Sequence, residues 1–361
     1  MDKSEILKHF LNKGIQVNSE ALDTLYNHPE RLEEITSMSL KELPLVLSED
    51  FILKGRSVKI LKQLELKKRY SVEDATELIN YRYSFIKTLL AKKNLENLIS
   101  ANRISDKLPK FTLIALVTQV GEREIKIEDN TGSLTLEASP EILEHLLEND
   151  IVALVCEKEE GFIKVTEVIF PDIEIKRAVV KSEQPSHITI LPTKLDIKNY
   201  GKLLELVRKQ PSTKIFLLET DIDIGRLKAD LSEHEIFFFG GEANNKEEML
   251  YPNPALIEFN NVKIFLTSSN LLSHYAEKWD IDMEKTMTLL LKRRNLNPSS
   301  SLHEGNIYFL DIVPDIIIMT KGDPAVYNYK GTTVLLGGDS AVPILWHVDL
   351  QTREIFKTSF L

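Results

Sequence analysis

Residues 111–138 read FTLIALVTQVGEREIKIEDNTGSLTLEA, a stretch that contains short runs rich in Val, Ile, Leu and Thr. Runs of this composition predict β-strands, here over 111–119, 124–128 and 133–137. The tetrad Asp129-Asn130-Thr131-Gly132 separates the last two runs and is typical of a tight turn. This part of the chain is therefore expected to form consecutive β-strands.

Two further strands are predicted downstream, over 150–157 and 162–169. A short helix is expected before them, starting at Ser139-Pro140 and running through Leu147, because Pro is favoured at the first helical position. The order strand–strand–strand–helix–strand–strand is that of an OB-fold barrel. We therefore expect an OB-fold over residues 107–180.

The segments on either side of the barrel have a different character. Residues 181–361 alternate strand and helix patterns, which is typical of a layered α/β domain. Residues 1–40 read as short helices, and residues 41–106 read as a basic linker followed by a helix over 71–98. The fold class expected is multidomain α+β, with a small helical N-terminal module, an OB-fold barrel and an α/β sandwich.

Composition excludes several classes of protein. The net charge of −10 argues against a surface that traps nucleic acid over its whole extent. The single cysteine, Cys156, excludes an intramolecular disulfide and a cysteine-based zinc site. No apolar run is long enough for a membrane span, so a cytoplasmic protein is expected. Lys54–Arg69 is basic, and two interpretations stay open: a solvated linker, or a stripe that contacts nucleic-acid phosphates.

The loops that should carry the chemistry of the α/β domain have unusual side chains. An open α/β sheet holds its site in the loops after its strands, here expected after Leu191, Glu219, Phe239, Thr267 and Thr320. A pair of divalent cations needs several carboxylate or imidazole ligands converging from such loops. None of these loops contains a histidine, and one contains Lys321, whose ammonium group repels cations.

Five runs of sequence resemble the small subunit of the archaeal family-D DNA polymerase, which is related to the non-catalytic B-subunits of eukaryotic replicative polymerases. They are ELINYRYSFIK (77–87), IEDNTGSL (127–134), LLLKRRNLNP (289–298), IVPDIII (312–318) and VPILWHVDLQT (342–352). The resemblance covers most of the chain. It implies that residues 181–361 are a calcineurin-like phosphoesterase sandwich.

Active members of this family use the phosphoesterase domain as a 3′–5′ proofreading exonuclease with an Asp-x-His, Gly-Asp, Gly-Asn-His-Asp, His, Gly-His-x-His series of metal ligands. Here every step of that series departs from the pattern. The aligned positions are Leu191, Thr193, Thr220, Glu242, Ala243, Asn244, Ser268, Lys321 and Asp323. The resemblance therefore implies an inactivated phosphodiesterase domain over 181–361, with no catalytic residue, no metal and no cofactor.

The function expected is that of a non-catalytic accessory subunit of a DNA polymerase, without enzymatic activity of its own. The large catalytic subunit is the expected partner; DNA through the complex and other replication factors through the N-terminal module are further expected contacts. Two alternatives stay open. One is a metal-dependent 3′–5′ exonuclease with an atypical site, made of Asp221, Asp223, Glu242, Asn244 and Asp323. The other is an OB-fold binder of single-stranded DNA.

The cluster Lys292-Arg293-Arg294 also allows two interpretations. It can contact DNA phosphates or an acidic patch on the partner, or it can be the solvated end of a helix whose dipole favours cations. Trp279 and Trp346 are candidates for interface anchors, with core packing favoured for Trp346 because it lies within a predicted strand.

Overall fold

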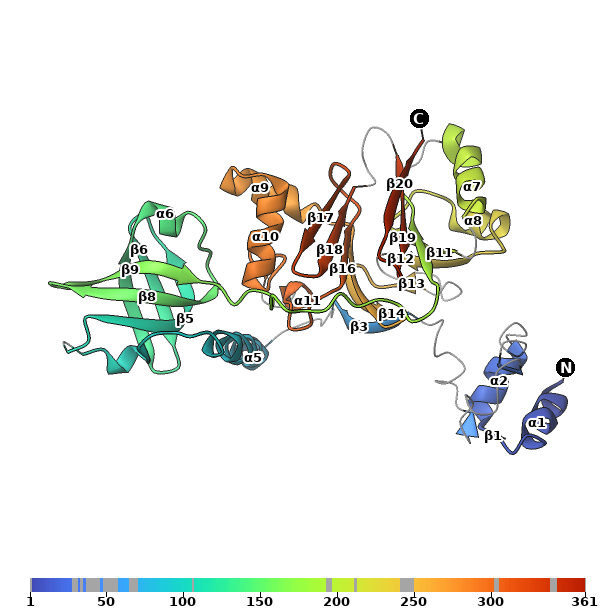
Figure 1. Cartoon of the computed structure of the whole chain (residues 1–361), viewed down its shortest axis with the longest axis horizontal. Coiled ribbons are helices and arrows are strands. Elements are labelled where there is room, and N and C mark those ends of the chain that lie inside the picture. The colour runs from blue at the N-terminus through green and yellow to red at the C-terminus, as the bar shows by residue number, and fades with distance from the viewer. Residues whose placement is uncertain are drawn as a thin grey trace. The chain divides into compact units, whose positions relative to one another are not determined.

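Figure 1 shows a computed structural model, which describes residues 2–27, 32, 35–36, 46–47, 58–64, 71–105, 107–192, 197–210, 213–240, 250–301, 305–337 and 343–360. The protein is a mixed helix-and-sheet structure with several sheets. It divides into two compact units, Met1–Lys59 with Glu258–Asn260, and Ile60–Ile257 with Asn261–Leu361. None of the helices in the described ranges has the length and apolar character to cross a membrane.

The first unit contains two short helices with a small core. Its elements are α1 (Lys3–Leu11), β1 (Gln16–Val17), α2 (Ser19–Asn27) and β2 (Val46–Leu47). Asp2 caps α1, because its Oδ1 accepts a hydrogen bond from Glu5 N at 2.8 Å. Ile6, Phe10 and Leu25 are buried between the helices, as their helical spacing in the sequence predicts.

The second unit begins with a strand, a long helix and a closed sheet. Its first elements are β3 (Lys59–Gln63, which starts one residue before this unit), α5 (Val72–Ala91), β4 (Leu98–Ile99), a 3₁₀ turn (Ala101–Arg103), β5 (Lys110–Val120), β6 (Glu124–Asp129), β7 (Gly132–Ala138), α6 (Pro140–Leu143), β8 (Ile151–Glu159) and β9 (Phe162–Ile169). The strand order is β4-β5-β6-β7-β9-β8, and β5 pairs with both β6 and β8. The sheet is therefore closed, and we call it the barrel. Pairing is antiparallel from β5 to β7, and β7 pairs with β9 in parallel.

Two helices near the barrel end earlier than the sequence predicts. Ser71 and Asp74 form a capping box at the start of α5, but α5 stops at Ala91 rather than Leu98. Residues 98–99 pair with β5 instead, so the sheet takes up the end of the predicted helix. Similarly, α6 stops at Leu143 rather than Leu147, where the N–H of Leu147 donates to Asp150 Oδ2 at 2.9 Å.

The rest of the second unit consists of two six-stranded sheets, which we call the sandwich. The first sheet has the order β13-β12-β11-β10-β19-β20 and the second β17-β18-β16-β15-β14-β3. Its remaining elements are β10 (His187–Ile190), a 3₁₀ turn (Ile197–Asn199), α7 (Tyr200–Arg208), β11 (Thr213–Leu218), α8 (Ile224–Asp230), β12 (Glu235–Phe239), β13 (Leu250–Tyr251), β14 (Ala255–Phe259), β15 (Val262–Thr267), α9 (Leu271–Trp279), α10 (Met283–Arg293), α11 (Gly305–Tyr308), β16 (Ile316–Met319), β17 (Ala325–Tyr329), β18 (Thr332–Leu336), β19 (Ile344–Asp349) and β20 (Ile355–Ser359).

Helices cover the outer face of each sheet. Helices α7 and α8 pack on the first sheet through Leu203, Val207 and Leu227, and α9, α10 and α11 pack on the second (Figure 1). Between the sheets, Trp346 Nε1 donates to Gly337 O at 3.1 Å. Trp346 is therefore a core residue, as the sequence favours, and Trp279 is also buried within the chain. Strands β10 to β13 run parallel, as do β15, β16 and β18.

Buried polar side chains join the barrel to the sandwich. Arg293, at the end of α10, pairs with Asp150 of the barrel at 3.2 Å, and its guanidinium lies over the rings of Trp279 and Phe170 at 4.8 and 4.7 Å. Arg294 Nε donates to the backbone oxygen of Asp172 at 2.8 Å. Both arginines are buried, so the two interpretations of 292–294, phosphate or partner contact and solvated helix end, are wrong for them.

Candidate functional site

The strand ends of the two sheets meet in the sandwich, and those positions aligned with metal ligands that the structure describes lie there. Strands β10, β11 and β12 end at one edge of the first sheet because they run parallel. Strands β15, β16 and β18 likewise share an edge of the second sheet. In α/β proteins such edges are where loops assemble binding and catalytic sites.

One amide side chain links these two edges directly. Asn253 Nδ2 donates to Glu219 Oε1 and to Ser268 Oγ, both at 2.8 Å. Asn253 Oδ1 accepts from the backbone N–H of Ser268 at 3.2 Å. Glu219 follows β11 and Ser268 follows β15, so the bridge spans from the first sheet to the second. Asn253 therefore ties one carboxylate oxygen of Glu219 to the hydroxyl group of Ser268.

The other described positions at this edge have structural contacts. Leu191 is buried in the apolar cluster under α7. Thr220 Oγ1 accepts from Ile222 N at 3.0 Å and shapes the turn after β11. Asp223 caps α8, since its Oδ1 accepts from Arg226 N at 3.0 Å. Asp223 is therefore already engaged in holding a helix end, which weakens the case for it as a metal ligand.

The loop after β16 presents one acidic and one basic side chain to solvent. Lys321 and Asp323 are both exposed, on either side of Gly322, whose φ of +105° suits glycine. Thr320 is fully buried, and its Oγ1 has no hydrogen-bond partner among the described residues. The loop therefore places an ammonium group, and no imidazole, beside the strand ends.

Several predicted site residues lie outside the described residues. These are Thr193, Glu242, Ala243 and Asn244. Within the described ranges, no three His, Cys, Asp or Glu side chains come close enough to hold a metal ion. Asn253 was missed by the sequence reasoning; the only signal for it is its position between Pro252 and Pro254, just before β14.

Of the two lysines in the described part of the basic segment, Lys59 is exposed and Lys62 contacts protein. Within 54–69 only residues 58–64 are described. In that part, Lys62 Nζ donates to Phe309 O at 2.9 Å and to Asp311 Oδ1 at 3.0 Å. Burial lowers the pKa of Lys62, although the attraction of Asp311 opposes this. Lys62 thus joins β3 to the segment that follows α11 within the sandwich, and it is not an exposed phosphate ligand.

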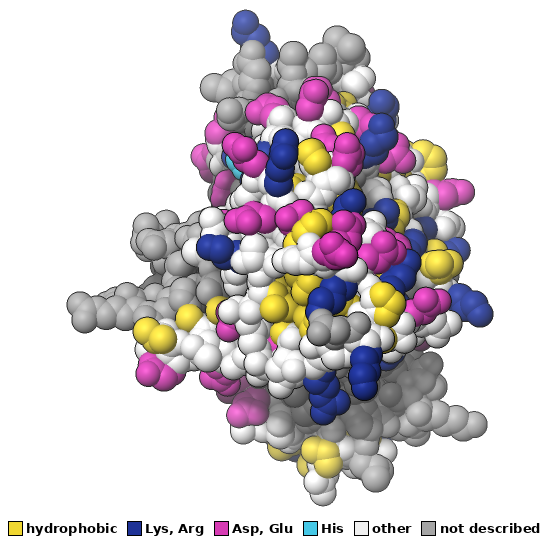
Figure 2. Space-filling model, turned by 90° about the vertical axis from the view of Figure 1, so that its left-hand side faces the viewer, with side chains coloured by type: hydrophobic (Ala, Val, Ile, Leu, Met, Phe, Trp, Pro, Cys, Tyr) yellow, Lys and Arg dark blue, Asp and Glu magenta, His cyan; other side chains and the backbone are white. Residues whose placement is uncertain are grey.

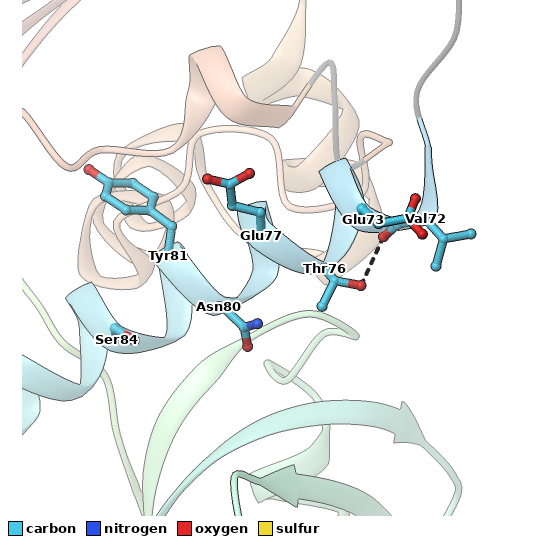
Figure 3. A pocket seen from close by; sticks show the side chains of 7 residues that line it. All are labelled: Val72, Glu73, Thr76, Glu77, Asn80, Tyr81 and Ser84. Atoms are coloured by element: carbon cyan, nitrogen blue, oxygen red, sulfur yellow. Dashed lines mark hydrogen bonds between the residues drawn. The ribbon is translucent and has the colours of Figure 1, made fainter.

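An open groove of about 660 Å³ lies along helix α5, and its lining residues all come from this helix (Figure 3). Glu77 and Tyr81 project from one side of the helix and Asn80 and Thr76 from the other. Tyr81 donates to Asp311 Oδ2 at 2.9 Å, and burial together with this hydrogen bond raises its pKa to about 12. The groove is lined by acidic, neutral polar and apolar side chains and by no cation, which does not suit nucleic-acid phosphates.

The barrel surface carries mixed charge. Figure 2 looks onto the side of the molecule that lies at the left of Figure 1, where the barrel is, and shows Lys and Arg interspersed with Asp and Glu. Single-stranded nucleic acid is bound by grooves of one positive sign with aromatic platforms. This face of the barrel lacks such a groove among the residues described.

Comparisons with known proteins identify no family. No protein-family model matches the chain, and no curated protein matches it significantly. Among solved structures, YjeQ from Thermotoga maritima is similar over 63% of this chain and 74% of that chain, with 14% sequence identity and a TM-score of 0.16. A likeness at that TM-score carries no argument about fold or function.

Proposed function

We propose that this chain is a non-catalytic accessory subunit of a replicative DNA polymerase. In this proposal the barrel is an OB-fold, and the sandwich is a calcineurin-like phosphoesterase domain whose exonuclease site has been lost. The resemblance to the family-D small subunit supports the assignment. The order of strands in the barrel, with α6 between β7 and β8 and a parallel β7–β9 pair, agrees with the OB-fold expectation.

The observation that carries the proposal is the Asn253 bridge. A phosphodiesterase needs several anionic or imidazole side chains directed at a shared pair of cations. At the strand ends, Asn253 Nδ2 donates to one carboxylate oxygen of Glu219 and to the hydroxyl oxygen of Ser268. The bridge stabilises the junction between the sheets and supports a scaffold function over a hydrolytic one.

Three of the five runs that carry the resemblance lie at contacts between the parts of the second unit. Tyr83, in the run 77–87, donates to Ile114 O of the barrel at 2.9 Å. Arg293, in the run 289–298, pairs with Asp150. The run 312–318 supplies the oxygens of Val313 and Pro314 that Arg177 binds. In this proposal, these contacts hold the parts of the second unit together as a scaffold that has no metal ligands at its strand ends.

Co-expression with the large polymerase chain of the source organism tests the proposal. We expect the two chains to copurify through affinity and size-exclusion steps as a stable complex. In parallel, the full chain alone should release no nucleotide from a mismatched primer–template with Mn²⁺ or Mg²⁺. A chain that stays free of the polymerase, or that degrades the primer with either metal, would contradict the proposal; tight binding of a short single-stranded oligonucleotide by the chain alone would favour the single-strand-binder alternative.

A further inference from the structure

Cationic side chains from three parts of the fold converge on the connection between the barrel and the sandwich, residues 170–173. Lys93 follows the end of α5. Lys292 and Arg294 lie at the end of α10, and Lys330 lies in the turn between β17 and β18. We call these four residues the cationic cluster.

Each member of the cluster contacts this connection directly. Lys93 Nζ donates to a backbone oxygen of the connection at 2.7 Å, and Arg294 Nε donates to Asp172 O at 2.8 Å. Lys330 Nζ pairs with the Asp172 carboxylate at 2.6 Å. The backbone oxygen of Lys292 accepts from the N–H of Asp172 at 2.8 Å. The four cations are therefore neighbours in space, although they lie far apart in the sequence.

The cluster holds like charges together at an electrostatic cost. Burial lowers the pKa of Lys93, Asp172 opposes this shift, and the other three cations lower the pKa further because they repel the ammonium group. Glu174 is a second carboxylate of this region and acts on Arg294. The cluster and these two carboxylates together carry a net positive charge, whereas the whole chain has a net charge of −10. An anion bound here would reduce the repulsion.

The ends of the two helices explain only part of this arrangement. Carbonyl groups at the ends of α5 and α10 favour nearby cations, but Lys330 comes from a turn between strands. An ammonium group has three donors, of which Lys93 uses one and Lys330 two in the described structure. Lys292 is half-buried, and its Nζ has no hydrogen bond or ion pair within the described ranges. The three lysines therefore keep donors for an outside acceptor, and the buried Arg294 adds charge.

We propose that the cationic cluster contacts phosphate groups of a nucleic-acid duplex. Ammonium groups neutralise phosphates as point charges and need no base-specific geometry. None of the four side chains has an aromatic ring on which unpaired bases could stack, which favours a duplex over a single strand. The choice of nucleic acid as the polyanion rests on the proposed function. Lys292 thus keeps the phosphate interpretation that burial rules out for Arg293 and Arg294.

The test measures how salt weakens binding of the full chain to a fluorescein-labelled DNA duplex of about 20 base pairs, followed by fluorescence anisotropy. The cluster has two more positive charges than Asp172 and Glu174 have negative charges, so it should neutralise about two phosphates. The logarithm of the association constant should then fall with the logarithm of salt concentration with a slope of about −1.8. Between about 20 and about 100 mM NaCl this is a loss of about eighteenfold.

Two variants should change that slope in opposite directions. Lys292→Gln removes one cation and should reduce the loss over the same salt range to about fourfold, a slope of about −0.9. Asp172→Asn removes one negative charge but keeps an acceptor for the N–H of Ile173. It should tighten binding and steepen the slope to about −2.7.

The matched control is Lys209→Gln, which makes the same charge change on α7, where Lys209 is exposed and pairs with Glu205. It should leave both affinity and slope unchanged. Circular dichroism checks that all three variants fold.

The inference fails if the chain shows no saturable binding to the duplex up to about 100 μM at about 20 mM NaCl. It also fails if Lys292→Gln binds with the wild-type slope, since another surface would then hold the DNA. Tighter binding of poly-L-glutamate than of the duplex, at equal total charge, would identify a surface for an acidic protein and would likewise refute it. A chain that copurifies with the polymerase and gives any of these results keeps its proposed function and loses only this DNA contact.

Discussion

The ion pair between Asp150 and Arg293 is expected to hold the barrel on the sandwich. Only 1% of the Arg293 side chain and 4% of the Asp150 side chain are exposed, and Arg293 Nε lies 3.2 Å from the carboxylate. Removing one member of such a pair leaves the other charge buried without compensation, which costs about 3–5 kcal/mol. Against a typical total stability of about 5–15 kcal/mol, that is a large fraction.

Two single variants and the double variant measure how much the ion pair contributes to the free energy of unfolding. Arg293→Met keeps an unbranched apolar stem between Trp279 and Phe170, and Asp150→Asn keeps an acceptor for the N–H of Leu147. We expect each single variant to lose about 3–5 kcal/mol of unfolding free energy. The double variant should lose less than the sum by about 2 kcal/mol, because neither charge is then left alone.

Urea unfolding followed by tryptophan fluorescence measures these losses. The chain has 2 tryptophans, and Trp279 lies against Arg293 at the joint. The control is Lys209→Met, which removes a 2.7 Å ion pair with Glu205 whose side chains are both mostly exposed, and it should leave the unfolding midpoint unchanged.

The pH dependence gives a second check on the same pair. Burial raises the pKa of Asp150, and Arg293 is the cation that opposes this shift. In Arg293→Met the folded carboxyl therefore binds a proton at higher pH than the unfolded one, so the deficit in stability should shrink as the pH falls below neutrality. Single variants that lose less than about 1 kcal/mol, or that add without coupling, would refute the reasoning.

Further measurements test other parts of the structure. Asn253→Ala removes the bridge to Ser268 and should lower the unfolding free energy by about 1–3 kcal/mol without creating Mn²⁺ binding by calorimetry. Tyr83→Phe leaves the buried oxygen of Ile114 unpaired and should lower the free energy of unfolding by about 1–2 kcal/mol, measured in urea. A change near zero would mean that this hydrogen bond does not help to hold α5 on the barrel. Since burial lowers the pKa of His347, the wild-type chain should lose stability as the pH falls through 6.5, when the unfolded ring binds a proton and the folded ring does not. His347→Asn should abolish that part of the pH dependence of thermal unfolding. If the melting temperature of the variant depends on pH as that of the wild type does, the lowered pKa of His347 is contradicted.

Local pattern was enough for much of the secondary structure. The barrel strands, the turn through Asn130-Thr131 and the start of α5 all follow from residues that are neighbours in the chain. The ends of α5 and α6 were predicted too late, because residues 98–99 gain more from pairing with β5 than from extending a helix. Strands β17 and β20 were missed, since each lies at the edge of its sheet, is partly exposed and mixes polar with apolar residues, and each pairs with one strand only, β18 or β19.

In the candidate sites, tertiary structure determines which side chains are buried and which residues they pair with. The strand-end loops contain no histidine, which is visible in the sequence, so the proposal that they lack metal ligands needed no structure. The roles of Asn253 and Arg293 were not, because their partners lie far along the chain: Asp150 is 143 residues from Arg293. Charge and polarity are properties of a residue, but burial and pairing depend on which distant segments the packed sheets bring together, and these decide whether an arginine meets solvent, a phosphate or a carboxylate.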